Sequence, residues 1–157
     1  MTRDVMTPQR VAVVTGGAMG IGAAVVQRLA VLGHQVFIAD RDTEAAQLTA
    51  NKLCTQGFDV KSVTMDVADS SSISHAFADI ESLAGRCDIL VNSAGVATVA
   101  SFLEFPLEEF TRTMSINVTG TLLCSQHAAR LMVKNQWGRI INIASVAGMR
   151  AVGKGRT

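Results

Sequence analysis

The chain has 157 residues, 48% of them hydrophobic, with 14 basic and 13 acidic side chains. This is enough for one globular domain with a buried core, which excludes an intrinsically disordered protein. The charges are balanced and scattered, the apolar runs are too short to span a membrane, and the N-terminus lacks a signal-peptide core, so we expect a cytoplasmic protein without a nucleic-acid or membrane partner.

The cysteines and histidines are isolated from one another. Cys54, Cys87 and Cys124 are odd in number and widely spaced, which suits neither a disulfide framework nor a zinc pattern. We expect all three to be buried free thiols. No metal site is predicted, and no catalytic or ligand role is assigned to the histidines, which are His34, His75 and His127.

Short apolar runs alternate with helical patterns along the chain. Residues 1–9 are expected to be a loose tail and residues 10–157 one domain. The apolar runs predict five strands at 11–15, 35–40, 59–65, 88–92 and 138–144. Helices are predicted at 20–32, from Asp42 or Thr43 to near Gly57, from Asp69 through an apolar stripe ending at Leu83, and as one long helix over 106–136.

This alternation is typical of right-handed βαβ units and a parallel sheet. The strands are apolar on both faces, as a sheet covered on both sides requires. The sequence therefore predicts an α/β fold with three layers, a doubly wound parallel sheet with strand order 3-2-1-4-5. In such a sheet ligands bind at the carboxyl ends of the strands.

A glycine-rich turn joins the first predicted strand to the first helix, with the sequence T-G-G-A-M-G-I-G at 15–22. Glycines let a ligand approach the backbone, and the free N–H groups and dipole of a new helix attract an anion. A dinucleotide pyrophosphate is the anion we expect, and a tight turn without ligand is the alternative. The contacts are assigned to Gly16, Met19, Gly20, Ile21 and Gly22.

Asp40 ends the second predicted strand, where an acidic residue can accept hydrogen bonds from the adenosine ribose. Its charge would repel a 2′-phosphate at about 4 Å by about 4 kcal/mol at an effective dielectric near 20. Asp40 therefore favours NAD over NADP, whereas Arg41 weakly favours NADP. A helix cap is the alternative interpretation of Asp40.

The remaining strand ends carry further candidates. Asp66 and Val67 follow the third strand, where an Asx-turn is the alternative. The stretch N-S-A-G at 92–95 would let the backbone approach a flat ligand. Ser145 follows the fifth strand and could donate a hydrogen bond to a substrate carbonyl, a turn serine being the alternative. Within the long helix Asn117 and Gly120 each reduce helix stability, so a reason for them is expected.

Together these features resemble the short-chain dehydrogenases/reductases over residues 11–148. The glycine spacing, N-S-A-G in place of N-N-A-G, and Ser145 carry the resemblance. It implies a Rossmann-type fold and hydride transfer between a nicotinamide cofactor and a small-molecule carbonyl or secondary alcohol. Met19 agrees with NAD, because NADP-preferring members often have a basic residue there. Members are usually homodimers or homotetramers in which the long helix packs against another subunit.

The resemblance also implies roles for single residues. Asp66 and Val67 would meet the adenine, and Asn92 would bridge strands and hold the loop. Asn117 would hold a water that leads to a catalytic lysine, or else it is a solvent-facing or core-bonded asparagine. The adenosine pocket would be lined by Ala94 and Gly95, and the substrate carbonyl would be polarised by Ser145.

The family's proton-transfer pair is not found. A tyrosine about thirteen residues after the serine and a lysine four residues later are expected, but the chain contains no tyrosine and its last residue is Thr157. An unshifted Lys154, with a pKa near 10.4, is a poor substitute. We therefore expect a truncated chain without the C-terminal strands, an uncovered apolar edge at 138–144, and negligible turnover. The alternatives are a non-catalytic dinucleotide-binding fragment, an interaction module, or an incomplete coding sequence.

Overall fold

A computed structural model describes residues 8–146 of the chain. Most of the predicted tail, residues 1–9, lies outside this range. Gly148, Lys154 and Thr157, which entered the sequence argument, also lie outside the described residues.

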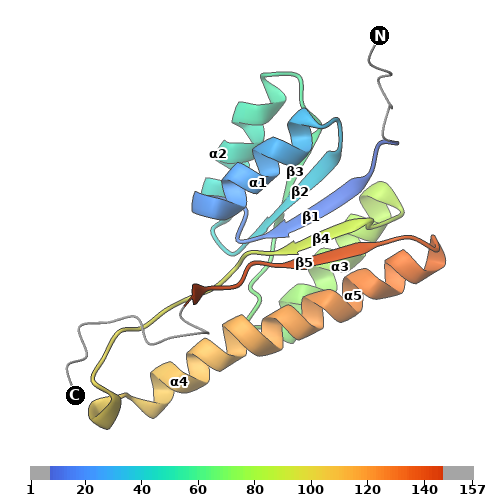
Figure 1. The fold of residues 1–157 in the computed structure, drawn as a ribbon. Coiled ribbons are helices and arrows are strands. Elements are labelled where there is room, and N and C mark those ends of the chain that lie inside the picture. Colours follow the sequence, from blue (N-terminus) through green and yellow to red (C-terminus); the bar gives the residue numbers. More distant parts are fainter. Residues whose placement is uncertain (1–7, 147–157) are drawn as a thin grey trace.

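The described residues form a five-stranded parallel sheet with helices on both faces (Figure 1). The strand order β3-β2-β1-β4-β5 confirms the predicted doubly wound fold. The strands lie within the predicted ranges, and the first two match them to the residue. Their bounds are β1 Val11–Thr15, β2 Gln35–Asp40, β3 Val60–Thr64, β4 Ile89–Asn92 and β5 Arg139–Asn142.

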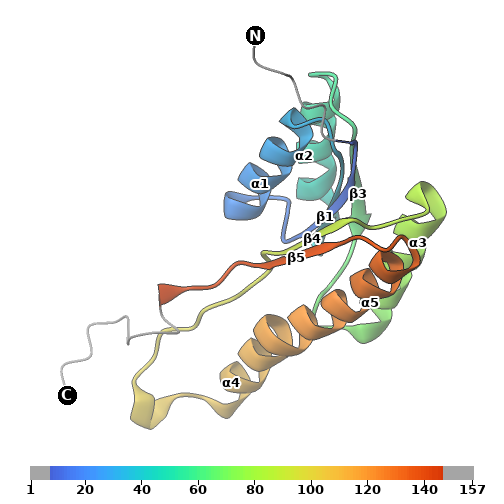
Figure 2. The same ribbon diagram turned by 45° about the vertical axis from the view of Figure 1, so that its right-hand side comes forward.

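The helices follow the predicted pattern with one interruption. The predicted long helix is one rod in Figure 1, but a π-helical segment divides it near its middle. Figure 2 shows α1 and α2 on one face of the sheet and α3 and α5 on the other. The bounds are α1 Gly20–Val31, α2 Thr43–Cys54, α3 Ser70–Ala84, the 3-10 turn η1 Phe102–Glu104, α4 Leu107–Met114, the π-helical segment η2 Ser115–Gly120, and α5 Thr121–Lys134.

Side chains fix where α2 and α3 begin. The Asp42 carboxylate accepts the N–H of Ala45 at 3.0 Å, which resolves the predicted choice between Asp42 and Thr43 as the cap of α2. The Asp69 carboxylate accepts the N–H of Ser71 at 2.9 Å and caps α3. Helix α2 ends at Cys54, before Gly57, because residues 55–57 form a turn that needs a positive φ at the glycine.

Two apolar cores lie on the two faces of the sheet. Because neighbouring residues of a strand point to opposite faces, Val14 packs toward α1 and α2 whereas Val13 packs toward α3 and α5. The first core includes Val26 of α1 and Ile38 of β2. Both faces of β1 and β2 are therefore buried, as their continuous apolar sequences predict.

The β5 edge is much less covered than the centre of the sheet. Among the residues that the structure describes, β5 pairs with β4 on one side and has no strand on the other, and Ile140 and Ile141 are 40% and 47% exposed. This confirms the predicted uncovered apolar edge. None of the helices within residues 8–146 is both long and apolar enough to cross a membrane.

The expectation that all three cysteines are buried is wrong for Cys54. Cys54 is exposed, because it is the last residue of α2 and lies on the solvent side, where its thiol donates to the carbonyl of Val60 at 3.0 Å. Cys87 and Cys124 are buried. Burial raises the pKa of each of these two thiols to about 12, and the charge of Asp88 adds to the effect at Cys87.

Candidate functional site

The carboxyl ends of the central strands border a cleft of about 420 Å³. Helix α1 begins at its margin, the segments that follow β2, β3 and β4 form most of the lining, and Ile116 of η2 and Ile143 after β5 also belong to it. All predicted cofactor-binding residues line this cleft except Gly20 and Asn92. Those in the lining are Gly16, Met19, Ile21, Gly22, Asp40, Asp66, Val67, Ala94 and Gly95.

The glycine turn is folded tightly against itself and against the loop after β4. Gly16 has a φ of 64°, and its N–H donates to the carbonyl of Ala39 at 2.8 Å. A Cβ at Gly16 would lie 2.8 Å from the Cα of Ala94. A Cβ at Gly22 would lie 2.1 Å from the carbonyl oxygen of Gly16. Glycine is therefore required at both positions for this turn to close.

The start of α1 keeps unused hydrogen-bond donors beside the cleft. Within the described part of the chain, Met19, the N-cap residue, supplies no side-chain acceptor to the first turn. The N–H groups of a first turn have no partners inside the helix and are available to an anion. Met19 and Ile21 are 62% and 65% exposed in the cleft lining. Gly20, with a φ of 58°, shapes the turn rather than lining the cleft.

Asp40 is half-buried at the end of β2, and both of its carboxylate oxygens have backbone partners. One oxygen accepts the N–H of Ala18 at 3.0 Å, and the other accepts the N–H of Asp42 at 3.1 Å. Each oxygen of an ionised carboxylate can accept more than one hydrogen bond. Asp40 therefore fixes the glycine turn, shapes the loop before α2, and still has acceptor capacity at the cleft.

The segment after β3 brings Asp66 and Val67 to the cleft. The Asp66 carboxylate accepts the N–H of Ala68 at 2.9 Å, which is the Asx-turn that the sequence offered as an alternative. The backbone N–H of Asp66 donates to the Ser72 hydroxyl at 2.9 Å. A Cβ at Gly120 would lie 2.6 Å from the carbonyl oxygen of Val67. The glycine inside the long helix is thus explained by the close approach of this segment.

Thr15 is a site residue that the sequence analysis did not single out. Its side chain is 1% exposed, and its hydroxyl accepts the N–H groups of both Ser93 and Ala94 at 3.1 Å. This ties the end of β1 to the loop after β4. A hydroxyl at the end of an apolar strand was the available signal. Arg41, which the sequence suggested as a weak signal for NADP, also lines the cleft. Cleft residues to which the sequence assigned no contact are Asp42, Met65, Ser93, Val96, Ile116 and Ile143.

Asn92 is buried behind the cleft and links three elements. Its amide nitrogen donates to the hydroxyl of Ser125 on α5 at 3.1 Å and to the side-chain oxygen of Asn142 on β5 at 2.8 Å. Its own side-chain oxygen has no hydrogen-bond partner among the residues that the structure describes. Asn92 thus acts on the position of β4 relative to β5 and α5.

The two predicted catalytic residues lie outside the cleft lining. Asn117, in η2, accepts the N–H of Val96 at 2.9 Å and donates to the carbonyl of Val96 at 2.8 Å, so its side chain holds the loop after β4. Ser145 is exposed and lies three residues beyond the end of β5, whereas Ile143, two residues earlier, lines the cleft. Nine of the eleven predicted cofactor residues therefore lie in one cleft lining, whereas neither Asn117 nor Ser145 belongs to that lining.

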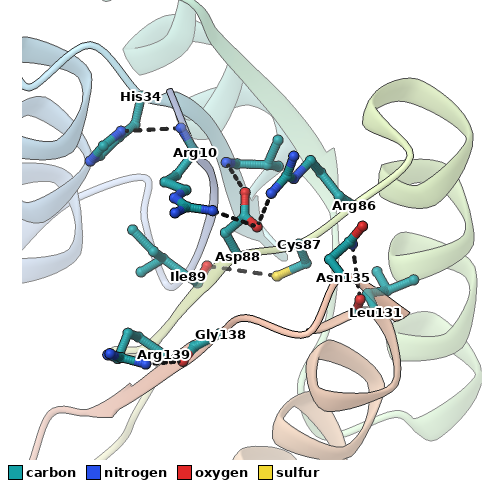
Figure 3. A network of polar contacts seen from close by, with 11 residues as sticks. Arg10, His34, Arg86, Cys87, Asp88, Ile89, Leu131, Asn135, Gly138 and Arg139 are labelled. Atoms are coloured by element: carbon teal, nitrogen blue, oxygen red, sulfur yellow. Dashed lines mark hydrogen bonds and ion pairs between the residues drawn. The ribbon is translucent and has the colours of Figure 1, made fainter. Parts of the chain in front are cut away.

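A second polar cluster lies at the opposite, amino ends of the strands (Figure 3). Asp88 is buried; one carboxylate oxygen accepts the N–H of Val11 at 2.8 Å and the other accepts Arg86 at 2.6 Å. The guanidinium of Arg10 lies 3.9 Å from the same Asp88 oxygen and 3.9 Å from the ring centre of Trp137. Within residues 8–146, no three or more His, Cys, Asp or Glu residues are grouped to hold a metal ion.

A sequence model of the short chain dehydrogenase family matches residues 10–156. An uncharacterized oxidoreductase of Thermotoga maritima is 42% identical over 146 residues, covering 93% of this chain and 57% of that protein. A 3-oxoacyl-(acyl-carrier-protein) reductase of Aquifex aeolicus is 38% identical, covering 88% and 56%. A D-threitol dehydrogenase of Mycolicibacterium smegmatis is 38% identical, covering 91% and 55%.

Solved structures are similar over the same part. The crystal structure of gox2181 superposes with a TM-score of 0.91 at 35% identity and covers 93% of this chain and 57% of that one. An actinorhodin polyketide ketoreductase with NADPH gives a TM-score of 0.88 at 31% identity and covers 92% and 56%. The chain thus spans a little more than half the length of the relatives it matches.

Proposed function

We propose that this chain, which belongs to the short chain dehydrogenase family, binds a nicotinamide dinucleotide in the cleft. In the activity that we propose for the whole protein, a hydride is transferred between this cofactor and a carbonyl or secondary alcohol of a small molecule. The observation that carries the proposal is the glycine turn, which opens the uncapped start of α1 onto a cleft with an acidic residue at the end of β2.

The residues present fit such a cofactor. Gly16 and Gly22 let the turn close on itself and on the loop after β4, and the first turn of α1 offers N–H donors for a pyrophosphate. Asp40 would accept the adenosine ribose hydroxyls, and Asp66 with Val67 would meet the adenine. Ala94 and Gly95 would line the other side of the adenosine pocket, on the loop that Thr15 and Asn117 hold. When bound, the nicotinamide supplies or accepts the hydride.

We propose NAD as the preferred cofactor. The carboxylate of Asp40 is held in place by two backbone N–H groups, so it cannot turn away from a 2′-phosphate without losing both hydrogen bonds. Met19 provides no positive charge beside it. Arg41 also lines the cleft and would favour a 2′-phosphate, and one similar structure contains NADPH. The fixed carboxylate is the reason for preferring NAD.

The catalytic roles are also part of the proposal. Ser145 would polarise the substrate carbonyl, and Asn117 would support a water-mediated proton relay. A tyrosine cannot transfer the proton within this polypeptide, because the chain contains none. We therefore expect this chain by itself to bind the cofactor with negligible turnover, which is also what a non-catalytic dinucleotide-binding module would do.

Association with further subunits is the last part of the proposal. The long helix exposes apolar side chains, which supports its expected packing against another subunit. These are Leu107, Phe110, Met114, Val118 and Leu122.

The test is a fluorescence titration of the chain with NADH and NADPH. We expect saturable NADH binding and at least about tenfold weaker NADPH binding, since about 1.4 kcal/mol of the repulsion at Asp40 suffices for that factor. Asp40→Ala should narrow the difference, whereas Asp59→Ala, an exposed carboxylate at the other end of the sheet, should leave it unchanged.

Absence of saturable binding would contradict the proposed cofactor site. Equal affinities for NADH and NADPH would contradict the NAD preference alone. Oxidation of NADH by this chain across a panel of carbonyl compounds, at rates typical of dehydrogenases, would contradict the expected lack of turnover.

A further inference from the structure

Side chains from two neighbouring elements hold both peptide groups of Ala18, in the middle of the glycine turn. Asp40 of β2 accepts the Ala18 N–H at 3.0 Å, and the hydroxyl of Thr49 on α2 donates to the Ala18 carbonyl at 2.9 Å. Ala18 is buried and Thr49 is half-buried. Helices α1 and α2 lie side by side on one face of the sheet (Figures 1 and 2), and the Thr49 hydrogen bond joins α2 to the glycine turn that precedes α1.

The Thr49 hydrogen bond sets the direction of the peptide group between Ala18 and Met19. No cis peptide bond occurs in residues 8–146, so the N–H of Met19 points opposite to the Ala18 carbonyl. With that carbonyl bound to Thr49, the N–H of Met19 points away from α2. Rotation of this peptide group would move a carbonyl oxygen toward the pyrophosphate position and replace attraction by repulsion.

We propose that Thr49 is a positioning residue for dinucleotide binding. Its hydroxyl holds the Ala18 carbonyl on the α2 side, so that the turn presents N–H groups to the diphosphate. The inference rests on the proposed cofactor site and extends it to a residue outside the cleft lining. Because Thr49 contacts the turn and not the cleft, a search for residues close to the ligand would not find it.

Another threonine of the same region provides a matched control. Thr55, the C-cap residue of α2, also donates its hydroxyl to a backbone carbonyl, that of Lys52, at 2.8 Å. Thr55 has no contact with the glycine turn among the hydrogen bonds of the described chain. A purely local contribution to α2 would therefore be shared by both threonines, whereas an effect through Ala18 belongs to Thr49 alone.

The experiment compares Thr49→Val, Thr49→Ser and Thr55→Val in the full chain by NADH titration and urea unfolding. A neutral hydrogen bond corresponds to about a twofold to tenfold change in an equilibrium constant, so we expect Thr49→Val to raise the NADH dissociation constant about fivefold. Thr49 also lines a small groove between α1 and α2. Solvent in this groove could hydrogen-bond to the Ala18 carbonyl in place of the lost hydroxyl, so we expect the NADH dissociation constant of Thr49→Val to rise by no more than about tenfold. Thr49→Ser and Thr55→Val should stay within about twofold of the unmodified chain.

A second readout separates positioning from general loosening of the fold. Competition against NADH with ADP-ribose should show the same loss in Thr49→Val as NADH itself, because ADP-ribose contains the pyrophosphate. Adenosine has no phosphate, and its inhibition constant should be the same for Thr49→Val and the unmodified chain.

Several results would overturn the inference. One is an NADH dissociation constant of Thr49→Val equal to that of the unmodified chain. Another is a loss of NADH affinity in Thr49→Ser or Thr55→Val as large as that in Thr49→Val. A third is a loss of adenosine affinity in Thr49→Val as large as its loss of NADH affinity. If Thr49→Val does not fold, Thr49→Cys carries the same expectation, since a thiol is a weaker donor of similar size. NADH binding that Thr49→Val leaves intact overturns this inference alone, whereas no saturable binding in the unmodified chain overturns the proposed function and this inference together.

Discussion

The two ends of the sheet both carry polar side chains around a carboxylate, but they use them differently. At the amino end, Asp88 is buried, and its oxygens accept the N–H of Val11 and the guanidinium of Arg86; Figure 3 shows Arg86 and Arg10 beside Asp88. The guanidinium of Arg10 also stacks on Trp137. Arg139 lies on the same indole, with its guanidinium 5.0 Å from the ring centre. The Asp88 carboxylate is thus paired with Arg86 and Arg10, while Arg10 and Arg139 both pack on Trp137.

At the carboxyl end Asp40 lies in the cleft lining, and its hydrogen-bond partners within residues 8–146 are the N–H groups of Ala18 and Asp42. The uncapped first turn of α1 and the capacity left on Asp40 face a cleft of about 420 Å³. The difference teaches that a charged cluster alone does not mark a binding site. The end that we propose as the binding site is the one at which bonding capacity remains directed into a cavity.

The largest expected effect is a loss of stability when Asp88 is removed from the amino end of the sheet. Asp88→Ala leaves the buried N–H of Val11 without its acceptor and removes the ion-pair partner of Arg86. We expect a loss of about 2–4 kcal/mol in the free energy of unfolding, measured in urea. The NADH dissociation constant of the folded protein should not change, because Asp88 lies at the other end of the sheet.

Asp79→Ala is the control for this change, because Asp79 is an exposed carboxylate on α3. It should alter the free energy of unfolding by less than about 0.5 kcal/mol. A loss below about 1 kcal/mol in Asp88→Ala, or a clear change in its NADH affinity, would show that the two ends are not separate in function.

The second prediction concerns a substitution that opens the glycine turn at the carboxyl end of the sheet. Gly22→Ala would place a Cβ 2.1 Å from the carbonyl oxygen of Gly16, so the turn must open. We expect the NADH dissociation constant to rise at least about tenfold, which corresponds to about 1.4 kcal/mol. The control is Gln27→Ala, at an exposed position of α1, which should leave NADH binding unchanged. Unaltered affinity in Gly22→Ala would mean that the turn does not hold the cofactor.

The smallest expected effect is a loss of stability at high pH, which we expect from Cys87 at the amino end of the sheet. Burial first, and the charge of Asp88 second, raise the pKa of the Cys87 thiol to about 12, whereas a thiol in an unfolded chain has a pKa near 8.5. Above about pH 8.5 the unfolded chain releases a proton that the folded chain keeps, so stability falls as pH rises. Each such thiol contributes a loss of about 1 kcal/mol by about pH 9.5.

Urea unfolding of Cys87→Ala and the unmodified chain at a series of pH values measures this effect. The two free-energy curves should run parallel from about pH 6.5 to 7.5, where the thiol is protonated in both states. Above about pH 8.5 the unmodified chain should lose stability faster than Cys87→Ala. Parallel curves up to about pH 10 would contradict the expected burial of Cys87 and the exclusion of water from the amino end.

Local sequence patterns were sufficient for most of the fold. β1 and β2 could be predicted to the residue because their apolar runs are bounded by polar residues and glycines. Asp42 and Asp69 mark helix starts through hydrogen bonds that span only a few residues. The π-helical segment was missed, because one extra residue in a turn barely disturbs the apolar spacing of a long helix.

The residues that disturbed the helix pattern have their reasons far away in the chain. Asn117 is held by the backbone of Val96, 21 residues away, and Gly120 makes room for the carbonyl of Val67. The sequence showed only that both residues are unfavourable in a helix. Their partners become visible once the loop after β4 and the segment after β3 lie against η2.

The sequence by itself determined the strands, their order, the glycine turn and the candidates at the strand ends, since each depends on local spacing and on general rules for βα units. Only the tertiary structure decided which groups meet behind the turn. Thr15 binds backbone groups 78 and 79 residues away, and Thr49 binds a carbonyl 31 residues away. Such contacts depend on how strands and helices pack across the sheet, and a local pattern can mark the hydroxyl but does not identify partners at that distance.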